Sequence, residues 1–174
     1  MIYRTFGRTG LNVSLLGMGT GGWGMVGREQ GRRPITEGLL RRALDLGINL
    51  FDTAGGYMDS ELVLGKVLRG VPRDSYVLSD KLGVGPSPEF PHFLPADQVV
   101  REVETSLERL GLDHMDLLLI VSSGPESLPN LMDEYVPVLE KLRDEGKVGF
   151  LGLTESSKDD GRHEWIDAAL KYDV

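Results

Sequence analysis

The 174-residue sequence contains no cysteine, which excludes disulfide bonds and thiolate catalysis and fits a reducing compartment. It has no apolar run long enough to span a membrane, and its opening, MIYRTFGRTG, lacks the apolar stretch of a secretory signal. Basic residues are outnumbered as well, because the sequence has 19 Lys and Arg and 27 Asp and Glu, which gives a net charge of −8. That balance argues against a nucleic-acid partner and an anionic membrane surface. We therefore expect a cytoplasmic protein that binds neither.

The composition is that of one globular domain. Hydrophobic residues make up 40% of the chain, which is enough for a core at this length. No linker or run of like charges divides the sequence, so residues 1–174 are predicted to form a single domain.

Strand-like and helix-like segments alternate along the chain. Ile2–Phe6 and Leu11–Leu15, joined by a turn at Gly7–Gly10, predict a hairpin that leads into a first buried strand ending near Gly19. The later strands are predicted at Ile48–Asp52, Ser75–Lys81, Met115–Val121 and Val148–Leu153. The helices are predicted at Thr36–Leu46, Ser60–Leu68, Ala96–Leu110, Glu134–Glu145 and His163–Tyr172, the first four ending near Gly47, Gly70, Gly111 and Gly146. Because the strands are apolar throughout, they predict an α/β fold with a parallel sheet buried on both faces.

The stretch GMGTGGWG contains the spacing Gly17-x-Gly19-x-x-Gly22, which also occurs in dinucleotide-binding loops. In those loops a helix begins at once after the third glycine, and an acidic residue follows about 20 positions later. Here the next predicted helix begins only near Thr36, and the next acidic strand end is Asp52. A strand end whose backbone needs room beside a ligand is the favoured interpretation, and a Rossmann-type module is the alternative.

The segment GINLFDTAGGYMDSELVLGKVL, residues 47–68, resembles the aldo-keto reductase family. SDKLG, GFLGLTES and the opening YRTFGRTGLNVSLLGMGTGGWG are similar to other parts of that family, so the likeness runs from about residue 2 to the end of the chain. The resemblance implies a parallel (β/α)8 barrel of the TIM type, truncated to about five βα units and preceded by a β-hairpin. It also implies that Asp52, Tyr57 and Lys81 are catalytic residues.

The chemistry of these three residue types suits carbonyl reduction. Hydride addition to a carbonyl needs a proton donor at the oxygen, and a tyrosine with its ordinary pKa of about 10 is a sluggish acid at neutral pH. A neighbouring ammonium stabilises the phenolate, and a carboxylate holds the ammonium in place. Asp52 and Lys81 are predicted at the C-terminal ends of successive strands, with Tyr57 in the loop between, where barrel enzymes collect their active residues.

The resemblance also implies the positions around a cofactor and a substrate. Cofactor-binding residues would be Gly19, Thr20, Asp52, Thr154 and Glu155, and substrate-binding residues Trp23, Tyr57, Val121 and Ser122. The implied cofactor is NADP, with NAD as the alternative, and no metal site is predicted. Ser60 and Glu61 are interpreted as helix-start residues rather than catalysts.

Two departures from the family pattern stand out. The family usually has a histidine five residues after an aspartate at the end of the fourth strand, but counting from Asp116 leads to Val121. Valine cannot donate a hydrogen bond to a substrate oxygen, so reduced or altered activity is expected. The second departure is length, since a barrel needs eight units and usually about 250 residues. A fragment is therefore expected, with the residues that grip a cofactor phosphate outside it and with open sheet edges that favour self-association.

These observations favour an NAD(P)H-dependent oxidoreductase that reduces an aldehyde or ketone, or oxidises the corresponding alcohol or sugar. In this hypothesis Tyr57 delivers the proton while Lys81 and Asp52 tune it. The alternative is a non-catalytic family member that acts as a binding or regulatory chain.

Overall fold

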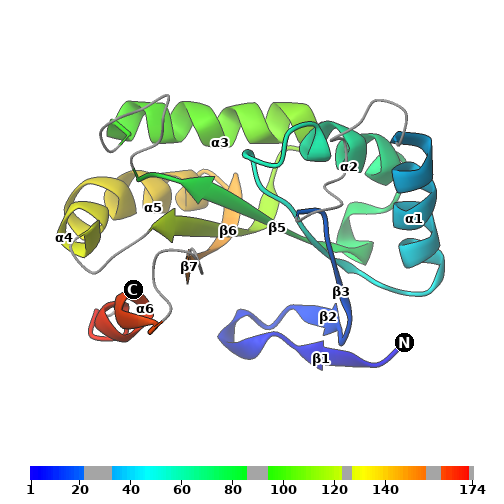
Figure 1. The fold of residues 1–174 in the computed structure, drawn as a ribbon, viewed down its shortest axis with the longest axis horizontal. Coiled ribbons are helices and arrows are strands. Elements are labelled where there is room, and N and C mark those ends of the chain that lie inside the picture. The colour runs from blue at the N-terminus through cyan, green and yellow to red at the C-terminus, as the bar shows by residue number, and fades with distance from the viewer. Residues whose placement is uncertain (22–32, 86–93, 123–126, 156–161, 173–174) are drawn as a thin grey trace.

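The structure of the chain, a computed structural model, describes residues 1–21, 33–85, 94–122, 127–155 and 162–172. Its centre is a sheet of five parallel strands in the order β3-β4-β5-β6-β7 (Figure 1). The strands are Gly17–Gly19 (β3), Leu50–Asp52 (β4), Val77–Gly83 (β5), Met115–Ser122 (β6) and Val148–Glu155 (β7). The predicted parallel sheet is confirmed, but its predicted burial on both faces does not extend to the edge strands, because β3 has no buried residue and only Val148 is buried in β7. Each strand pairs with its predecessor in the chain, which is barrel order and not the reversing order of a doubly wound sheet.

Helices connect the strands and cover the sheet. They are α1 (Arg33–Asp45), α2 (Ser60–Leu68), α3 (Ala96–Leu110), α5 (Val136–Asp144) and, after β7, α6 (Glu164–Ala169). Helices α1, α2 and α3 lie along one side of the sheet (Figure 1), with α2 in contact with both neighbours. The predicted glycine terminators are confirmed, because Gly47, Gly70, Gly111 and Gly146 all have φ between +68° and +83°. No helix within the described residues is both long and apolar enough to cross a membrane.

The helical segment before β7 differs from its predicted bounds. A helix was expected at Glu134–Glu145, but the chain is already helical in α4 (Leu128–Asn130), and a π-helical turn at Leu131–Tyr135 (η5) joins α4 to α5. Core packing explains the difference, because Leu128, Leu131 and Tyr135 are buried and hold the segment helical despite its two prolines. Pro129 lies in the first turn of α4 and Pro137 in the first turn of α5, where a missing N–H is tolerated.

The hairpin closes the N-terminal end of the sheet. It consists of β1 (Tyr3–Thr5) and β2 (Asn12–Ser14), joined through a 3-10 turn at Gly7–Thr9 (η1), and it lies on the opposite side of the sheet from α3 (Figure 1). Val13 of β2 packs on Val77 and Leu117, near the starts of β5 and β6. Asn49, just before β4, accepts from the Ser14 N–H at 2.6 Å and donates to the Asn12 carbonyl oxygen at 2.9 Å. The predicted hairpin is confirmed, and it leaves the C-terminal strand ends clear for a site.

Helices α2 and α3 approach closely at one glycine. A Cβ built on Gly65 would lie 2.3 Å from the Leu110 carbonyl oxygen. Leu64, Val67, Val103 and Leu107 fill the core around this crossing. The approach holds the start of α2, and with it the loop after β4, against the rest of the helical layer.

Candidate active site

The strand register places the predicted residues on one face of the sheet. Gly19 pairs with Asp52, Asp52 with Ser79, Lys81 with Leu119, and Val121 with Thr154. Paired residues of neighbouring strands share a face, and alternate residues along one strand do the same. Gly19, Asp52, Lys81, Val121 and Thr154 therefore lie on the same face, near the C-terminal ends of their strands, where barrel enzymes carry their active sites.

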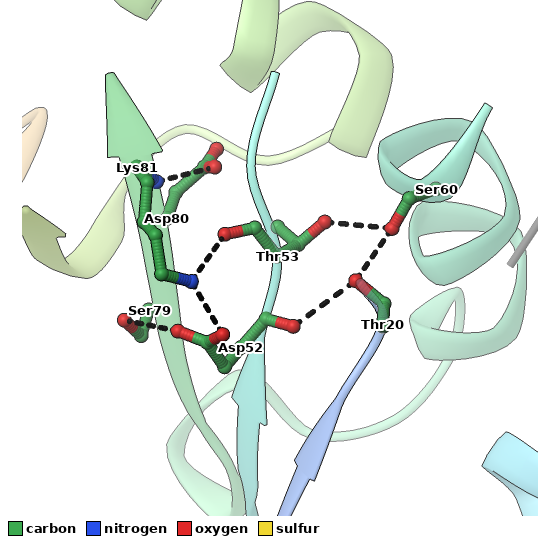
Figure 2. A network of polar contacts seen from close by, with 7 residues as sticks. All are labelled: Thr20, Asp52, Thr53, Ser60, Ser79, Asp80 and Lys81. Atoms are coloured by element: carbon green, nitrogen blue, oxygen red, sulfur yellow. Dashed lines mark hydrogen bonds and ion pairs between the residues drawn. The ribbon is translucent and has the colours of Figure 1, made fainter. Parts of the chain in front are cut away.

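Lys81 and Asp52 form an ion pair at the centre of this face (Figure 2). The ammonium donates to Asp52 Oδ2 and, at 3.0 Å, to the carbonyl oxygen of Thr53. The other Asp52 oxygen accepts from the Ser79 hydroxyl at 3.1 Å. The Lys81 side chain is 15% exposed, so the charge is largely withdrawn from water and its position is set by these partners. A lysine ammonium has three donors, and among the described residues two of them are used here.

Three hydroxyls join β3, the loop after β4 and the start of α2 (Figure 2). The Thr20 backbone N–H and hydroxyl both donate to the Asp52 carbonyl oxygen, at 2.9 and 3.0 Å. The Ser60 hydroxyl donates to Thr20 Oγ1 at 2.6 Å and lies 2.8 Å from the Thr53 hydroxyl. All three side chains are buried. Because each hydroxyl has a partner, this network fixes the backbone that carries Asp52.

Tyr57 lies beside the ion pair. Lys81 Nζ is 5.4 Å from the centroid of the Tyr57 ring, on its face, which is a cation–π arrangement. On the side of β3 the ring rests against Gly21, since a Cβ built there would be 2.6 Å from two ring carbons. The chain turns sharply after the tyrosine, because Met58 has a φ of 55° and the Ser60 N–H donates to the Tyr57 carbonyl oxygen. The structure thus brings Asp52, Tyr57 and Lys81 together, as the sequence predicts.

The other predicted site residues differ in what their side chains do. Gly19 is open, with no heavy atom within 4 Å of the place a Cβ would take, and Val121 and Thr154 are half-buried neighbours. Glu155 faces α6, where its carboxylate accepts from the Ile166 N–H at 3.2 Å and contacts His163 Nδ1. Trp23 and the side chain of Ser122 lie outside the described residues. Glu155 is therefore already engaged, whereas Gly19 and Thr154 remain accessible from the candidate site.

Among the described residues, the first helix after the glycine spacing 17-x-19-x-x-22 is α1. This helix begins at Arg33, and a Cβ built on Gly17 would lie 3.4 Å from the Leu50 side chain. Of the three described glycines of this stretch, Gly17, Gly19 and Gly21, the one with a tight contact is Gly21, which makes room for the ring of Tyr57. The strand order excludes the Rossmann-type alternative as well.

Two buried acids lie near the site: Asp80, which was not singled out in the sequence, and Glu61, which was interpreted there only as a helix-start residue. Asp80 and Glu61 are 1% and 0% exposed. Asp80 Oδ1 accepts from the Lys81 N–H at 2.7 Å (Figure 2), and Glu61 Oε2 lies 3.1 Å from Arg109 Nη1 of α3. The pKa of Asp80 is raised from 3.8 to about 7, chiefly by burial and next by the charge of Glu61. The sequence did carry a signal for Asp80. An aspartate stands in the middle of the strand VLSDKLG, where burial of an ionised side chain costs free energy. Ser60 and Glu61 do begin α2, as expected.

Residues 15–172 match the profile of the Aldo/keto reductase family. The chain belongs to this family. An L-galactose dehydrogenase of Arabidopsis thaliana is 38% identical over 160 residues, which cover 87% of the chain and 47% of the relative. A Schizosaccharomyces pombe protein, provisionally named a voltage-gated potassium channel subunit beta, is 35% identical over 99% of the chain and 50% of the relative.

Solved aldo-keto reductases share the fold. A structure from Klebsiella pneumoniae in complex with NADPH is 28% identical and superposes with a TM-score of 0.71, over 99% of this chain and 55% of that protein. A holo form from Bacillus halodurans is 27% identical with a TM-score of 0.74, over 89% of this chain and 50% of that protein. The chain thus spans about half the length of the curated relatives it matches. Its five-stranded sheet corresponds to about half of a family barrel.

Proposed function

We propose that the chain carries the proton-transfer site of an NAD(P)H-dependent reductase of aldehydes or ketones. The observation that supports this most directly is the position of Lys81, whose ammonium is bonded to Asp52 and faces the ring of Tyr57. A catalytic acid, a cation and an anion that holds the cation are the parts that proton delivery to a carbonyl oxygen requires.

In the proposed reaction Tyr57 donates its phenolic proton to the carbonyl oxygen of the substrate. The Lys81 ammonium, which lies over the face of the Tyr57 ring, stabilises the phenolate that remains. Asp52 and the Thr53 carbonyl oxygen keep the ammonium in place, so little rearrangement is needed when charge develops on Tyr57. The reverse reaction, oxidation of an alcohol or a sugar, uses the same three groups, with the phenolate accepting the proton.

Residues around Gly19 suit a nicotinamide cofactor. The backbone at Gly19 is open, and Asp52 and Thr154 lie on the same face. The Thr20 hydroxyl and the Glu155 carboxylate have hydrogen-bond partners within the chain. We therefore propose that these two side chains hold the backbone around the cofactor site in place. A bound NADPH, or NADH, supplies the hydride that reduces the carbonyl carbon. NADP is the preferred cofactor of the proposal, since the Klebsiella pneumoniae relative is in complex with NADPH.

The experiment compares Tyr57→Phe with the unaltered 174-residue chain. NADPH binding is followed by quenching of tryptophan fluorescence, and turnover of an aromatic aldehyde by loss of NADPH absorbance. We expect Tyr57→Phe to bind NADPH as the unaltered chain does and to lose about 10²-fold or more of the turnover, because the acid is removed and the ring is kept. Tyr172→Phe alters an exposed tyrosine in a different part of the chain and serves as the matched control. Equal turnover by Tyr57→Phe and Tyr172→Phe would refute the assignment.

A second candidate function is that of a binding or regulatory chain without turnover. Val121 favours it, because it stands where the family usually places a histidine donor, and so does the relative named as a channel subunit. This candidate predicts NADPH binding without turnover, and it predicts that Val121→His creates none. The enzymatic candidate predicts that Val121→His raises turnover, because the new donor faces the same side of the sheet as Lys81.

A further inference from the structure

Asp80 and Glu61 form a pair of buried carboxyl groups in the wall behind Lys81. Asp80 lies between Ser79 and Lys81 on β5, so its side chain points to the opposite face of the strand from theirs, toward the helices. Glu61 occupies the first turn of α2, and its carboxylate is fully buried. The pair therefore joins the strand that bears Lys81 to the helix that begins directly after the Tyr57 loop.

Within the described residues, each acid has one oxygen with a bonding partner and one oxygen without. Asp80 Oδ1 accepts from the Lys81 N–H, and Glu61 Oε2 is paired with Arg109. Asp80 Oδ2 and Glu61 Oε1 are both buried, and within the described part of the chain neither has a hydrogen-bond donor. Glu61 is nevertheless near enough to bond the side chain of Asp80.

An ionised carboxylate only accepts hydrogen bonds, so two ionised acids cannot bond one another. One proton shared between the two acids allows a hydrogen bond between their two unpartnered oxygens. It also leaves a single negative charge, which the guanidinium of Arg109 balances. Among the described residues the pair has one ion-pair partner, Arg109, whose side chain is 43% exposed, so two ionised carboxylates at this depth would be a costly arrangement.

The pair also lies beneath the loop that carries Tyr57. A Cβ built on Gly55 would be 3.7 Å from Glu61 Oε1, and Gly55 precedes Tyr57 by two residues. Ser60, which precedes Glu61 in the chain, donates a hydrogen bond to Thr20 Oγ1 and is hydrogen-bonded to the Thr53 hydroxyl. A movement of Glu61 is therefore passed to the loop from both sides of Tyr57.

We propose that Asp80 and Glu61 share one proton, and that this protonated pair positions Tyr57 against Lys81. Both acids are positioning residues and neither touches the substrate. The charged groups that face the pair are Lys81 on β5, Arg109 on α3 and, within the pair, Glu61 on α2. Loss of the proton as the pH rises through about 7 puts two negative charges under the loop and shifts the Tyr57 ring. The inference rests on the proposed function only for the role of Tyr57.

The test is carbon-13 NMR of the full chain, with carboxyl and tyrosine-ring signals followed from pH 5 to pH 8.5. We expect one carboxyl signal to titrate near pH 7 and to vanish in Asp80→Asn, and the Tyr57 ring signal, assigned with Tyr57→Phe, to move with the same midpoint. Asp80→Asn imitates the protonated acid, because its amide donates to Glu61 and its oxygen accepts from Lys81 N–H. It should hold the Tyr57 signal at its low-pH position throughout. Asp80→Ala should displace that signal at every pH.

Asp97→Asn is the matched control, since it removes an exposed carboxylate of α3 and should change neither signal. The proposal is overturned if no carboxyl sensitive to Asp80→Asn titrates between pH 5 and 8.5. It is equally overturned if the carboxyl titrates while the Tyr57 ring signal stays still. Should Asp80→Ala fail to fold, the comparison of Asp80→Asn with the unaltered chain still decides. None of these signals depends on turnover, so a failure of the proposed enzymatic function would be seen separately.

Discussion

At the level of single residues, Gly21 controls how closely the ring of Tyr57 approaches β3. The ring occupies the space that any Cβ at this position would need, with two ring carbons at 2.6 Å from it. On its face the ring has the Lys81 ammonium, at 5.4 Å from the centroid. The position of the Tyr57 ring therefore depends on the absence of a side chain at Gly21 as well as on the ion pair of Lys81 with Asp52.

We expect Gly21→Ala to push the Tyr57 ring out of place. A displacement of about 1 Å in a catalytic group costs on the order of 10² in rate, so turnover in the proposed reaction should fall by about that factor while the fold is kept. Ring NMR signals of Tyr57 and aldehyde turnover measure the effect. Gly56→Ala is the control in the same loop, since no heavy atom lies within 4 Å of its Cβ position, and it should leave the Tyr57 signals alone. Unchanged Tyr57 signals in Gly21→Ala would contradict this account.

The identities of Asp52, Tyr57 and Lys81 as neighbours could be predicted from the sequence, because each lies at or just after a strand end. The contacts of Gly21 and Asp80 could not. Gly21 is one of several glycines in GMGTGGWG, and nothing in their spacing says which of them faces a tyrosine 36 positions along the chain. The partner of Asp80 is Glu61 on another element, and only the packing of α2 on β5 brings the two acids together.

At the level of elements, the crossing of α2 and α3 depends on Gly65. We expect Gly65→Ala to destabilise the fold by about 1–3 kcal/mol, because the new methyl would meet the Leu110 backbone at 2.3 Å and backbone cannot rotate aside. Urea unfolding followed by circular dichroism measures the change. Gly38→Ala in α1 has open space around the new methyl and should instead stabilise the fold by about 0.5–1 kcal/mol. Equal unfolding midpoints for the two variants would show that the helix crossing tolerates a side chain.

The secondary elements themselves were predictable wherever their ends carry a local signal. Four helices stop near glycines in the left-handed region, and the sequences of β4 and β6 contain apolar runs. The prediction was wrong at the start of the helix before β7. Pro129 and Pro137 argue locally against a helix, but packing of Leu128, Leu131 and Tyr135 into the core holds the segment helical through a π-turn.

At the level of the whole molecule, Asp80 makes the stability depend on pH. The pKa of this acid is raised from 3.8 to about 7 by burial, so the folded state holds a proton that the unfolded state releases. The stabilisation is complete below about pH 4 and is lost as the pH rises through 7, with a total on the order of 4 kcal/mol. Urea unfolding at a series of pH values should show the unfolding free energy falling across this window.

Asp80→Asn should remove that dependence, because its amide does not ionise, and it should be the more stable protein above pH 7. In Asp97→Asn the slope between pH 4 and 7 should persist, since the pKa of Asp97 is lowered by its hydrogen bond with Arg101 and this group titrates below the window. Parallel curves for the unaltered chain and Asp80→Asn would mean that another group carries the pH dependence.

The edges of the sheet predict self-association. In the described part of the chain β3 and β7 each pair on one side only, and β7 is eight residues long. Beside β7 lies a hollow of about 530 Å³. Most of its lining is apolar, including Leu139, Phe150 and Leu153, and Arg8, Glu140 and Arg143 also line it. We expect sedimentation velocity to show association that grows with protein concentration. Phe150→Lys places a charge on the exposed edge and should weaken it. A monomer at every concentration would contradict this prediction.

The sequence by itself determined the order of helices and strands, the parallel sheet and the three residue types at the strand ends. These depend on patterns within single segments, namely apolar runs, helical periodicity and glycine stops. Only the tertiary structure decided that Tyr57 lies between Gly21 and Lys81 and that Asp80 meets Glu61. It also decided that Glu155 accepts a hydrogen bond from α6 instead of facing the candidate site. Each of these is a contact between elements far apart in the chain, and its energy depends on how closely the packed backbones approach and how far water is excluded.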